Sequence, residues 1–245
     1  LGTIVALDES RLQEGLLVVG TDDGLVRVSR DNGASWEKHE NFPGVPQKAY
    51  VTDVITSKHD VNTIYVSFNY HKYGDFTPYL VMTNDGGKTW REISSNIPEN
   101  NFIWTIVEDH LNPNLLFLGT EFGMFYSLDM GNSWREFKNV PTIPIRDLEI
   151  HEEEDDLVAA SFGRGFYIVD DYSPIREYSS QIDGQPAHLF SVKSTYQYIV
   201  AAPEKTATGH NFFTSPNPPY GVKLSYYLGN SILSKFEERQ NNEKA

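Results

Sequence analysis

Four short stretches of the 245-residue chain combine charged or aromatic side chains with glycine. They are 22–24 (Asp-Asp-Gly), 70–75 (Tyr-His-Lys-Tyr-Gly-Asp), 121–123 (Glu-Phe-Gly) and 163–165 (Gly-Arg-Gly). Carboxylates in such loops could serve as acid or base, an arginine offers a planar fork that fits a carboxylate, and flanking glycines let a ligand approach the backbone. We therefore expect a ligand-binding surface with the candidate contacts Asp22, Asp23, His71, Asp75, Glu121, Phe122 and Arg164.

A second set of residues recurs along the chain. Segments 29–36, 83–90 and 127–134 all follow the pattern [Ser/Thr]-x-Asp-x-Gly-x-[Ser/Thr]-Trp, called the Asp box below. Aspartate accepts hydrogen bonds from backbone N–H groups further along a turn, glycine supplies an unusual backbone angle, and the Trp begins the next strand and packs into the blade core. We therefore assign a structural role, in hairpin turns, to Asp31, Gly33, Trp36, Asp85, Gly87, Trp90, Asp129, Gly131 and Trp134.

The spacing of the boxes predicts the architecture. Their aspartates lie 54 and 44 residues apart, the length of one four-stranded propeller blade. Alternating apolar and polar residues predict the strands that lead to the boxes: 16–21, 25–28, 50–55, 63–68, 79–82, 103–107, 115–118 and 124–126. The sequence therefore predicts an all-β fold, a β-propeller of four-stranded antiparallel blades with Asp-box turns, of which about four blades are visible.

The fourth repeat lacks a complete box. Predicted strands at 146–150, 157–160 and 166–169 precede Asp171, but Tyr-Ser-Pro replaces the glycine turn and no Trp follows. The composition then shifts, so we place the blades in residues 1–176 and a β-rich C-terminal extension with a polar tail in 177–245. Strands are expected at 189–192, 196–200 and 222–228, and a short helix or disorder at 232–245. Because the chain opens without Met inside an expected strand, we expect a longer parent chain with further blades.

Three stretches carry a family resemblance. Residues 20–26 (GTDDGLV), 119–123 (GTEFG) and 162–171 (FGRGFYIVDD), together with the boxes, resemble the C-terminal half of the Asp-box, sortilin-like β-propellers, the bacterial BNR-repeat "glycosyl hydrolases". The resemblance runs from about residue 7 to 176. It implies an exported bacterial protein, whether periplasmic, outer-surface or secreted. The hydrolase label of that family is itself inferred from the repeats, so whether the chain is an enzyme stays open.

Charge and composition narrow the choice of partner. The formal net charge is −14, which argues against a nucleic-acid backbone or an anionic membrane, because both bind basic surfaces. No apolar run is long enough to span a bilayer, and the absence of cysteine excludes disulfides. The expected partners are a glycan or a protein and the rest of the parent chain. No cofactor is expected, with calcium at the acidic hairpin tip 152–156 as the alternative to a solvated turn.

The leading hypothesis is a ligand-binding or scaffold propeller that recognises a glycan or protein at its channel face. The alternative is a sialidase-like or xyloglucanase-like glycoside hydrolase whose active site lies only partly within this chain, with Asp22, Asp109 and Glu121 as candidate carboxylates. Arg146 and Arg164 do not make the arginine trio that sialidases need. A third hypothesis is an assembly factor, like the Asp-box propeller that helps build photosystem II. Arg164 has a structural alternative, an ion pair with Asp22 or Glu121 across the channel.

Overall fold

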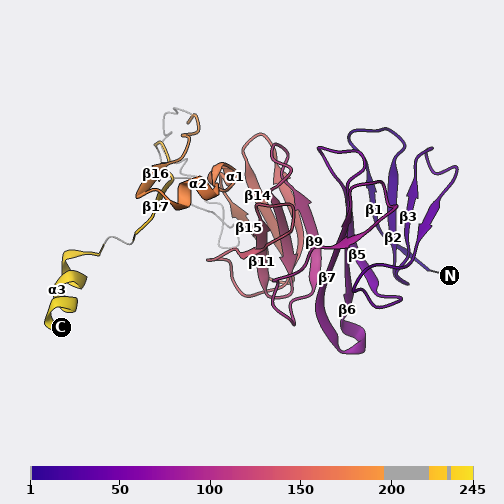
Figure 1. Cartoon of the computed structure of the whole chain (residues 1–245), viewed down its shortest axis with the longest axis horizontal. Coiled ribbons are helices and arrows are strands. Elements are labelled where there is room, and N and C mark those ends of the chain that lie inside the picture. The colour runs from indigo at the N-terminus through magenta and orange to yellow at the C-terminus, as the bar shows by residue number, and fades with distance from the viewer. Residues whose placement is uncertain (1, 196–220, 231–232, 245) are drawn as a thin grey trace, which may run out of the picture. The chain divides into compact units, whose positions relative to one another are not determined.

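The computed structural model describes residues 2–195, 221–230 and 233–244. The chain divides into two compact units, Leu1–Arg176 and Glu177–Ala245. The first unit holds four antiparallel sheets, which stand next to one another in chain order (Figure 1). Each sheet is one propeller blade.

The blades repeat one meander topology. The first three are four-stranded, in the orders β1-β2-β3-β4, β5-β6-β7-β8 and β9-β10-β11-β12, and the fourth is three-stranded, β13-β14-β15. The strands are β1 (Ile4–Glu9), β2 (Leu17–Thr21), β3 (Val26–Ser29), β4 (Glu37–His39), β5 (Tyr50–Thr56), β6 (Ile64–Tyr70), β7 (Asp75–Thr83), β8 (Arg91–Glu92), β9 (Ile103–Glu108), β10 (Leu116–Thr120), β11 (Gly123–Ser127), β12 (Arg135–Glu136), β13 (Ile145–His151), β14 (Asp156–Ser161) and β15 (Phe166–Val169). The predicted all-β propeller of antiparallel four-stranded blades is confirmed.

The hydrophobic core lies between the blades. One cluster joins β2 and β3 to β5–β7, a second joins β6 and β7 to β9–β11, and a third joins β9–β11 to β13 and β14. Small residues allow this close approach: a Cβ on Gly119 of β10 would lie 2.8 Å from the carbonyl oxygen of Ile145 in the next blade. Each blade therefore depends on its neighbours for burial of its apolar side chains.

The innermost strand of every blade pairs irregularly with the second strand near its start. The pairing skips one residue on each inner strand: Val5, Thr52, Trp104 and Arg146. A skipped residue of this kind is a β-bulge, which bends the strand and re-aims a side chain. These four positions are equivalent around the channel, and in the third and fourth blades they carry a large aromatic ring and a guanidinium.

The Asp boxes form the turns between third and fourth strands. In the second blade Asp85 Oδ1 accepts the Thr89 N–H at 2.9 Å and Oδ2 accepts the Thr89 hydroxyl at 2.6 Å. The Thr83 hydroxyl accepts the Gly87 N–H at 3.0 Å, and the same pattern recurs around Asp31 and Asp129. None of the three aspartates lines the cavity between the inner strands that is described below.

The tryptophans of the boxes do not simply fill the core of their own blade. Trp134 is buried and donates its Nε1–H to the carbonyl of Ile93, in the preceding blade, at 2.6 Å. Trp90 packs edge-on against Phe42 of the preceding repeat, with ring centroids 5.2 Å apart. Trp36 has no preceding blade within the described chain, and its Nε1–H bonds to Gly33 in its own turn at 3.0 Å. The box tryptophan is thus an inter-blade contact.

The end of the first unit and the second unit contain short elements. Helix α1 (Ser173–Glu177) follows β15, and the second unit holds α2 (Ser180–Asp183), a two-stranded sheet of β16 (Ala187–Leu189) with β17 (Tyr226–Leu228), and α3 (Lys235–Lys244). The predicted strand at 189–192 is displaced to β16, the one at 222–228 is limited to β17, and 196–200 lies outside the described residues. In the part of the chain that the structure describes, no helix has the length and apolarity needed to cross a membrane.

Candidate functional site

The predicted contact residues lie between the second and third strand of each blade, with Asp75 as the first residue of β7. Because the strands are antiparallel, these loops share one end of each blade with the start of its inner strand. Asp22 is engaged there: its Oδ1 accepts the Thr3 N–H at 2.7 Å. Asp23 Oδ1 accepts the Thr21 hydroxyl at 2.6 Å. Both carboxylates therefore hold the first blade's own loop and strand.

The second blade contributes a 3-10 helix, η1 (His71–Tyr73), between β6 and β7. His71 stacks on Phe102 with ring centroids 5.0 Å apart, and its Nδ1 lies 2.6 Å from Asn69 Oδ1. Burial lowers the pKa of His71, and neighbouring Lys72 lowers it further, which favours the neutral ring. Asp75 accepts the Tyr79 hydroxyl at 2.7 Å and the Thr77 N–H at 3.0 Å, which makes it a loop-holding group.

The third blade places Glu121 and Phe122 between β10 and β11. Glu121 Oε2 accepts the Trp104 Nε1–H at 2.9 Å, and the Phe122 N–H donates to Asn101 Oδ1 at 3.0 Å. The Phe122 ring is exposed. Glu121 therefore orients Trp104, while Phe122 is an open apolar contact.

Arg164 in the fourth blade is exposed between Gly163 and Gly165, both of which have a positive φ. Within the described residues it forms no ion pair with Asp22 or Glu121, and the alternative in which it closes the ring across the channel is not observed.

An arginine stacked between aromatic rings is the main feature that sequence reasoning missed. The Arg146 guanidinium carbon lies 3.3 Å from the centroid of the Trp104 ring and 4.9 Å from that of Phe162. Phe102 packs edge-on to Trp104 with centroids 4.9 Å apart. Together with His71 these residues, Phe102, Trp104, Arg146 and Phe162, are called the channel-face cluster below.

The signal that could have found this cluster is the repeat itself. Trp104 and Arg146 occupy the equivalent bulge position of adjacent inner strands, so aligning the repeats by strand would have placed them side by side. Burial lowers the pKa of Arg146 and Glu121 opposes this effect, but an arginine stays charged at any physiological pH. The stacked guanidinium keeps its N–H edges available for an anion.

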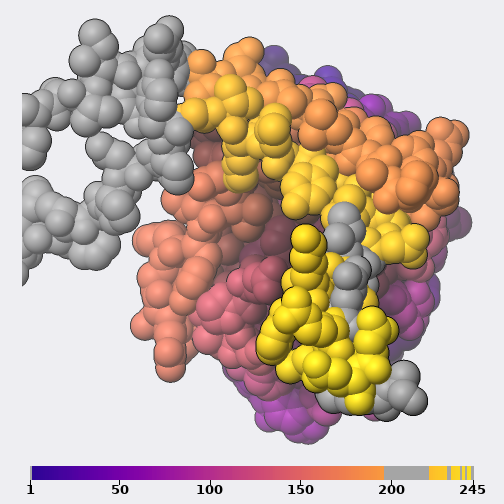
Figure 2. Space-filling view, turned by 90° about the vertical axis from the view of Figure 1, so that its left-hand side faces the viewer, coloured from indigo at the N-terminus to yellow at the C-terminus, as the bar shows by residue number. Residues whose placement is uncertain are grey.

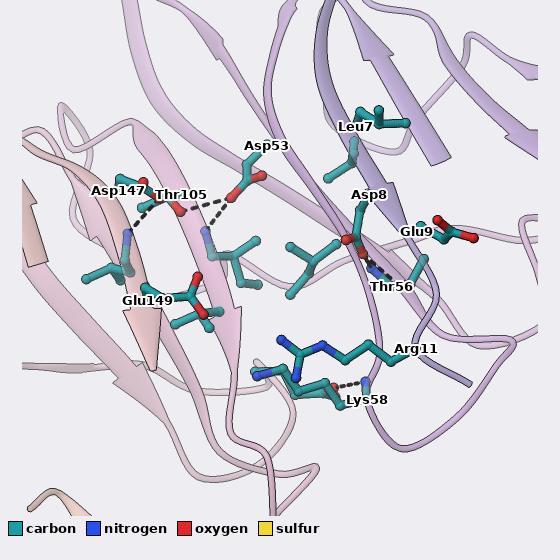
Figure 3. Close-up of a pocket in the computed structure, with 16 residues that line it drawn as sticks. Leu7, Asp8, Glu9, Arg11, Asp53, Thr56, Lys58, Thr105, Asp147 and Glu149 are labelled. Atoms are coloured by element: carbon teal, nitrogen blue, oxygen red, sulfur yellow. Dashed lines mark hydrogen bonds between the residues drawn. The ribbon is translucent and has the colours of Figure 1, made fainter. Parts of the chain in front are cut away.

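Below the cluster, the inner strands enclose a cavity of about 210 Å³ (Figure 3). Acidic side chains dominate its wall: Asp8, Glu9, Asp53, Glu108, Asp147 and Glu149, with Arg11 and Lys58 at one end. Asp53 Oδ2 accepts the Ile106 N–H at 3.0 Å and the Thr105 hydroxyl at 2.9 Å from the next blade, and Asp8 accepts the Thr56 N–H at 2.6 Å. These carboxylates tie neighbouring inner strands together.

Burial raises the pKa of Asp53 to about 6, even though its two hydrogen bonds to Ile106 and Thr105 favour the charged form. Burial likewise raises the pKa of Glu108, which accepts the Lys58 N–H at 2.6 Å and the Ser57 hydroxyl at 2.9 Å. The cavity thus holds one carboxyl, Asp53, with a pKa of about 6 and a second, Glu108, whose pKa is also raised by burial.

The acidic run 152–156 lies at the turn between β13 and β14, the hairpin tip that the sequence indicated, and Glu152 and Glu153 are exposed there, although two carboxylates of the run are paired. Glu152 pairs with Arg11 at 2.5 Å and with Lys58 at 3.1 Å, across the channel from the fourth blade. Asp155 pairs with Arg176 at 2.6 Å. Over residues 2–195, 221–230 and 233–244, no group of three or more His, Asp or Glu side chains is arranged to hold a metal ion.

Asp109, a candidate catalytic carboxylate, is fully buried and away from the channel face. It accepts the Tyr172 hydroxyl at 2.7 Å and hydrogen bonds from Arg176. Both of its carboxylate oxygens already accept hydrogen bonds, as expected for a structural group.

No family model matches the chain, and no curated protein matches it. Solved β-propeller structures do resemble it. YCF48 bound to D1 peptide aligns over 70% of this chain and 52% of that chain, with TM-score 0.51 and 18% identity. A GH74 xyloglucanase from Xanthomonas campestris aligns over 69% and 29%, with TM-score 0.56 and 12% identity. The extracellular domain of the BT4673 one-component system from B. thetaiotaomicron aligns over 69% and 21%, with TM-score 0.52 and 17% identity.

These identities show a common β-propeller fold and no more. The chain spans about half the length of YCF48 and less than a third of the other two proteins. The propeller part of the expected family resemblance is therefore supported by structure, whereas the Asp-box, sortilin-like assignment rests on the motifs quoted above.

Proposed function

We propose that this chain is the ligand-binding part of a β-propeller and that it recognises a protein or glycan segment at its channel face. The observation that carries the proposal is the Arg146 guanidinium, stacked 3.3 Å from the Trp104 ring centroid. Stacking fixes the orientation of the fork before a ligand arrives, which reduces the entropy cost of binding. The ligand therefore carries a carboxylate or another planar anion.

The rings around Arg146 favour a peptide. One face of Trp104 is covered by the guanidinium and Phe102 packs edge-on to the ring, so at most one face of this ring is left for a sugar. The open apolar contacts are Phe122 and Phe162, both exposed. Aromatic and arginine side chains together are typical of binding hot spots in protein interfaces. The structure of YCF48 with D1 peptide is a precedent within the same fold.

Of the residues proposed from the sequence, His71, Phe122 and Arg164 belong to this surface as contacts. Asp22, Asp23, Asp75 and Glu121 act through the loops and rings that they hold.

Export to the periplasm or cell surface is part of the proposal, supported by the family resemblance and by the extracellular BT4673 domain among the similar folds. Glycoside hydrolysis is the alternative function, and the GH74 fold neighbours keep it worth testing.

Peptide and glycan arrays probed with the purified 245-residue chain test the proposal, followed by titration of the best ligand. Arg146→Gln, which keeps the stem but removes the charge, should weaken binding at least tenfold. Arg135→Gln, on β12, the outermost strand of the third blade, is the matched control and should bind like wild type. Equal affinity of wild type and Arg146→Gln for every ligand found would contradict the proposed site.

A further inference from the structure

A second pocket lies at the same end of the blades as the channel-face cluster, where the first and second blades meet. It encloses about 180 Å³ and is lined by residues of both blades. Two lysines, Lys48 and Lys72, line it together with Asn69 and three tyrosines. Asp22 is the only carboxylate of this lining, and its Oδ1 already accepts the Thr3 N–H at 2.7 Å. In a chain with a formal net charge of −14, this grouping of cationic and aromatic side chains indicates a site for an anion.

Lys48 lies in a strained loop that the first blade holds in place. Its φ is +63°, in the left-handed region that residues with a Cβ rarely adopt. Gly24 of the loop between β2 and β3 approaches it closely, since a Cβ on Gly24 would lie 2.9 Å from the Lys48 Cα and 2.8 Å from the Ala49 carbonyl oxygen. Ala49 is buried, and its N–H donates to the Pro46 carbonyl at 3.2 Å. Strain that the surrounding structure maintains is typical of functional sites, and here it fixes a lysine in the lining of the pocket.

The short helix η1 connects this pocket to the channel-face cluster. It extends beyond the end of β6 (Figure 1), and purple spheres of this part of the chain reach the lower edge of the view in Figure 2. Its first residue, His71, stacks on Phe102 of the third blade. Its second residue, Lys72, places Nζ 5.2 Å from the centroid of the Tyr50 ring, within the pocket. Consecutive residues of one turn thus contribute to both sites, so the two sites are neighbours on one surface.

The pocket offers two charges and an aromatic wall. Within the described residues, neither Lys48 nor Lys72 forms an ion pair. Tyr70 and Tyr73 stack on each other with ring centroids 4.4 Å apart, which gives the wall a flat apolar surface. A lysine ammonium attracts a carboxylate as a point charge, and tyrosine rings fit the apolar stem of an acidic side chain. The lining therefore suits a glutamate or aspartate side chain of a bound polypeptide.

We propose that this pocket, with Lys48 and Lys72 as its charged contacts, is a second subsite for the polypeptide recognised at the channel-face cluster, and that it takes an acidic side chain of that polypeptide. The inference rests on the proposed function, in which Arg146 binds one carboxylate. A polypeptide with two acidic side chains engages both sites at once. The second contact is then intramolecular, so the affinity rises with the second acidic group. The proposed function thereby narrows to recognition of an acidic peptide.

Fluorescence polarisation with labelled short peptides and the purified 245-residue chain tests this. The peptides consist of glycine and serine with one phenylalanine and two glutamates at graded separations, and a matched series has glutamine in place of the second glutamate. The best two-glutamate peptide should bind at least about tenfold more tightly than its matched peptide. Lys72→Gln and Lys48→Gln should each remove most of this gain and leave the affinity for the one-glutamate peptide unchanged, because Arg146 is intact. Lys72→Arg, which keeps the charge, should retain the gain.

Lys88→Gln is the matched control. Lys88 is exposed in the Asp-box turn of the same blade, at the opposite end from η1, so this variant should retain the gain. Circular dichroism checks that each variant is folded. No gain from the second glutamate, or a gain that Lys72→Gln and Lys48→Gln leave intact, would overturn the subsite, while weaker binding of both series by Arg146→Gln would still support the proposed function.

Two further outcomes separate the inference from the function on which it rests. Failure of every peptide to bind would contradict the proposed function and the subsite together. Trigalacturonate, an acidic oligosaccharide, is the second probe, compared with galacturonate. A lysine-dependent gain for trigalacturonate without one for the peptides would overturn the assignment to an acidic peptide and identify an acidic glycan instead.

Discussion

Arg176 holds Asp109 across 67 residues of chain: its Nε lies 2.9 Å from Oδ1 and its Nη2 2.7 Å from Oδ2. Asp109 is fully buried in the turn after β9, and Arg176 lies in α1, which follows the fourth blade. The Tyr172 hydroxyl donates to the same carboxylate at 2.7 Å. The pair fastens the end of the last blade to the third blade, in the place where the fourth repeat lacks an Asp box.

Removing the arginine should therefore destabilise the propeller. Arg176→Met leaves a buried carboxylate without its charge partner and should cost about 3–5 kcal/mol in the free energy of unfolding. Arg11→Met is the control: its pair with Glu152 is exposed, and it should cost about 1 kcal/mol or less. Urea denaturation measures both. A cost for Arg176→Met no greater than that for Arg11→Met would contradict the structural role.

The dependence of the free energy of unfolding on pH below about pH 4 tests the same pair. Burial alone would raise the pKa of Asp109, but hydrogen bonds from Arg176 and Tyr172 hold it below its ordinary value. A carboxyl with a depressed pKa in the folded state contributes stability above its unfolded pKa, about 3.9, and loses that contribution as the pH falls through the folded pKa. Wild type should lose stability below about pH 4, and Arg176→Met should lose less over the same range.

The blades could be predicted from the sequence because each feature of the box has a local cause. The turn around Asp85 closes on Thr83 and Thr89, which lie within four residues of it, and the alternating strands beside it bury one face. The fold class follows from such short-range patterns once they repeat. The candidate loops could be located from the same pattern. In an antiparallel meander successive turns lie at opposite ends of the blade, so all loops between second and third strands lie at the same end.

The sequence could not predict which charged side chains already have hydrogen-bond partners within the chain. Asp22 bonds to a residue 19 positions away and Glu121 to one 17 positions away, and neither partner has a sequence signal. Nothing in the residues beside Arg146 marks it as stacked, because one partner ring, Trp104, lies on β9 and the other, Phe162, lies in the loop after β14. The residues of a site in a propeller come from different blades. Their proximity can therefore be predicted only by aligning the repeats strand by strand.

The box tryptophans should differ in their contribution to stability according to what lies before them. Trp134→Ala removes a buried ring and its hydrogen bond to Ile93 of the preceding blade, and should cost roughly 3–5 kcal/mol. Trp36→Ala should cost clearly less, because Trp36 is half-buried and bonds within its own turn. Asp129→Ala should cost roughly 1–3 kcal/mol by leaving turn donors unsatisfied. Denaturant melts give the order, and a larger loss for Trp36→Ala than for Trp134→Ala would contradict the inter-blade assignment.

Asp53 should make the fold more stable in mild acid than at neutral pH. Its pKa is raised to about 6, so the folded state holds a proton that the unfolded chain has released above about pH 4. The stability from this group is fully present below about pH 4 and is lost as the pH rises through about 6, a change of roughly 1–3 kcal/mol. Asp53→Asn can still accept from Ile106 and Thr105, so it should flatten this dependence. Melting temperatures at about pH 4.5 and 7.5 for both proteins check the sign, and an unchanged slope in the variant would refute the assignment to Asp53.

The chain should hydrolyse no sialoside or β-glucan above the uncatalysed rate. The carboxylates of the channel-face loops already accept structural hydrogen bonds: Asp22 from Thr3, Asp75 from Tyr79 and Glu121 from Trp104. Glycosidases need two carboxyl groups roughly 5–10 Å apart with one free to protonate the leaving group, and these groups instead hold backbone and rings in place. Fluorogenic glycosides incubated with the purified chain, with Glu121→Gln and with Asp53→Asn, provide the measurement. Turnover by wild type that either substitution abolishes would establish an enzyme and contradict this prediction.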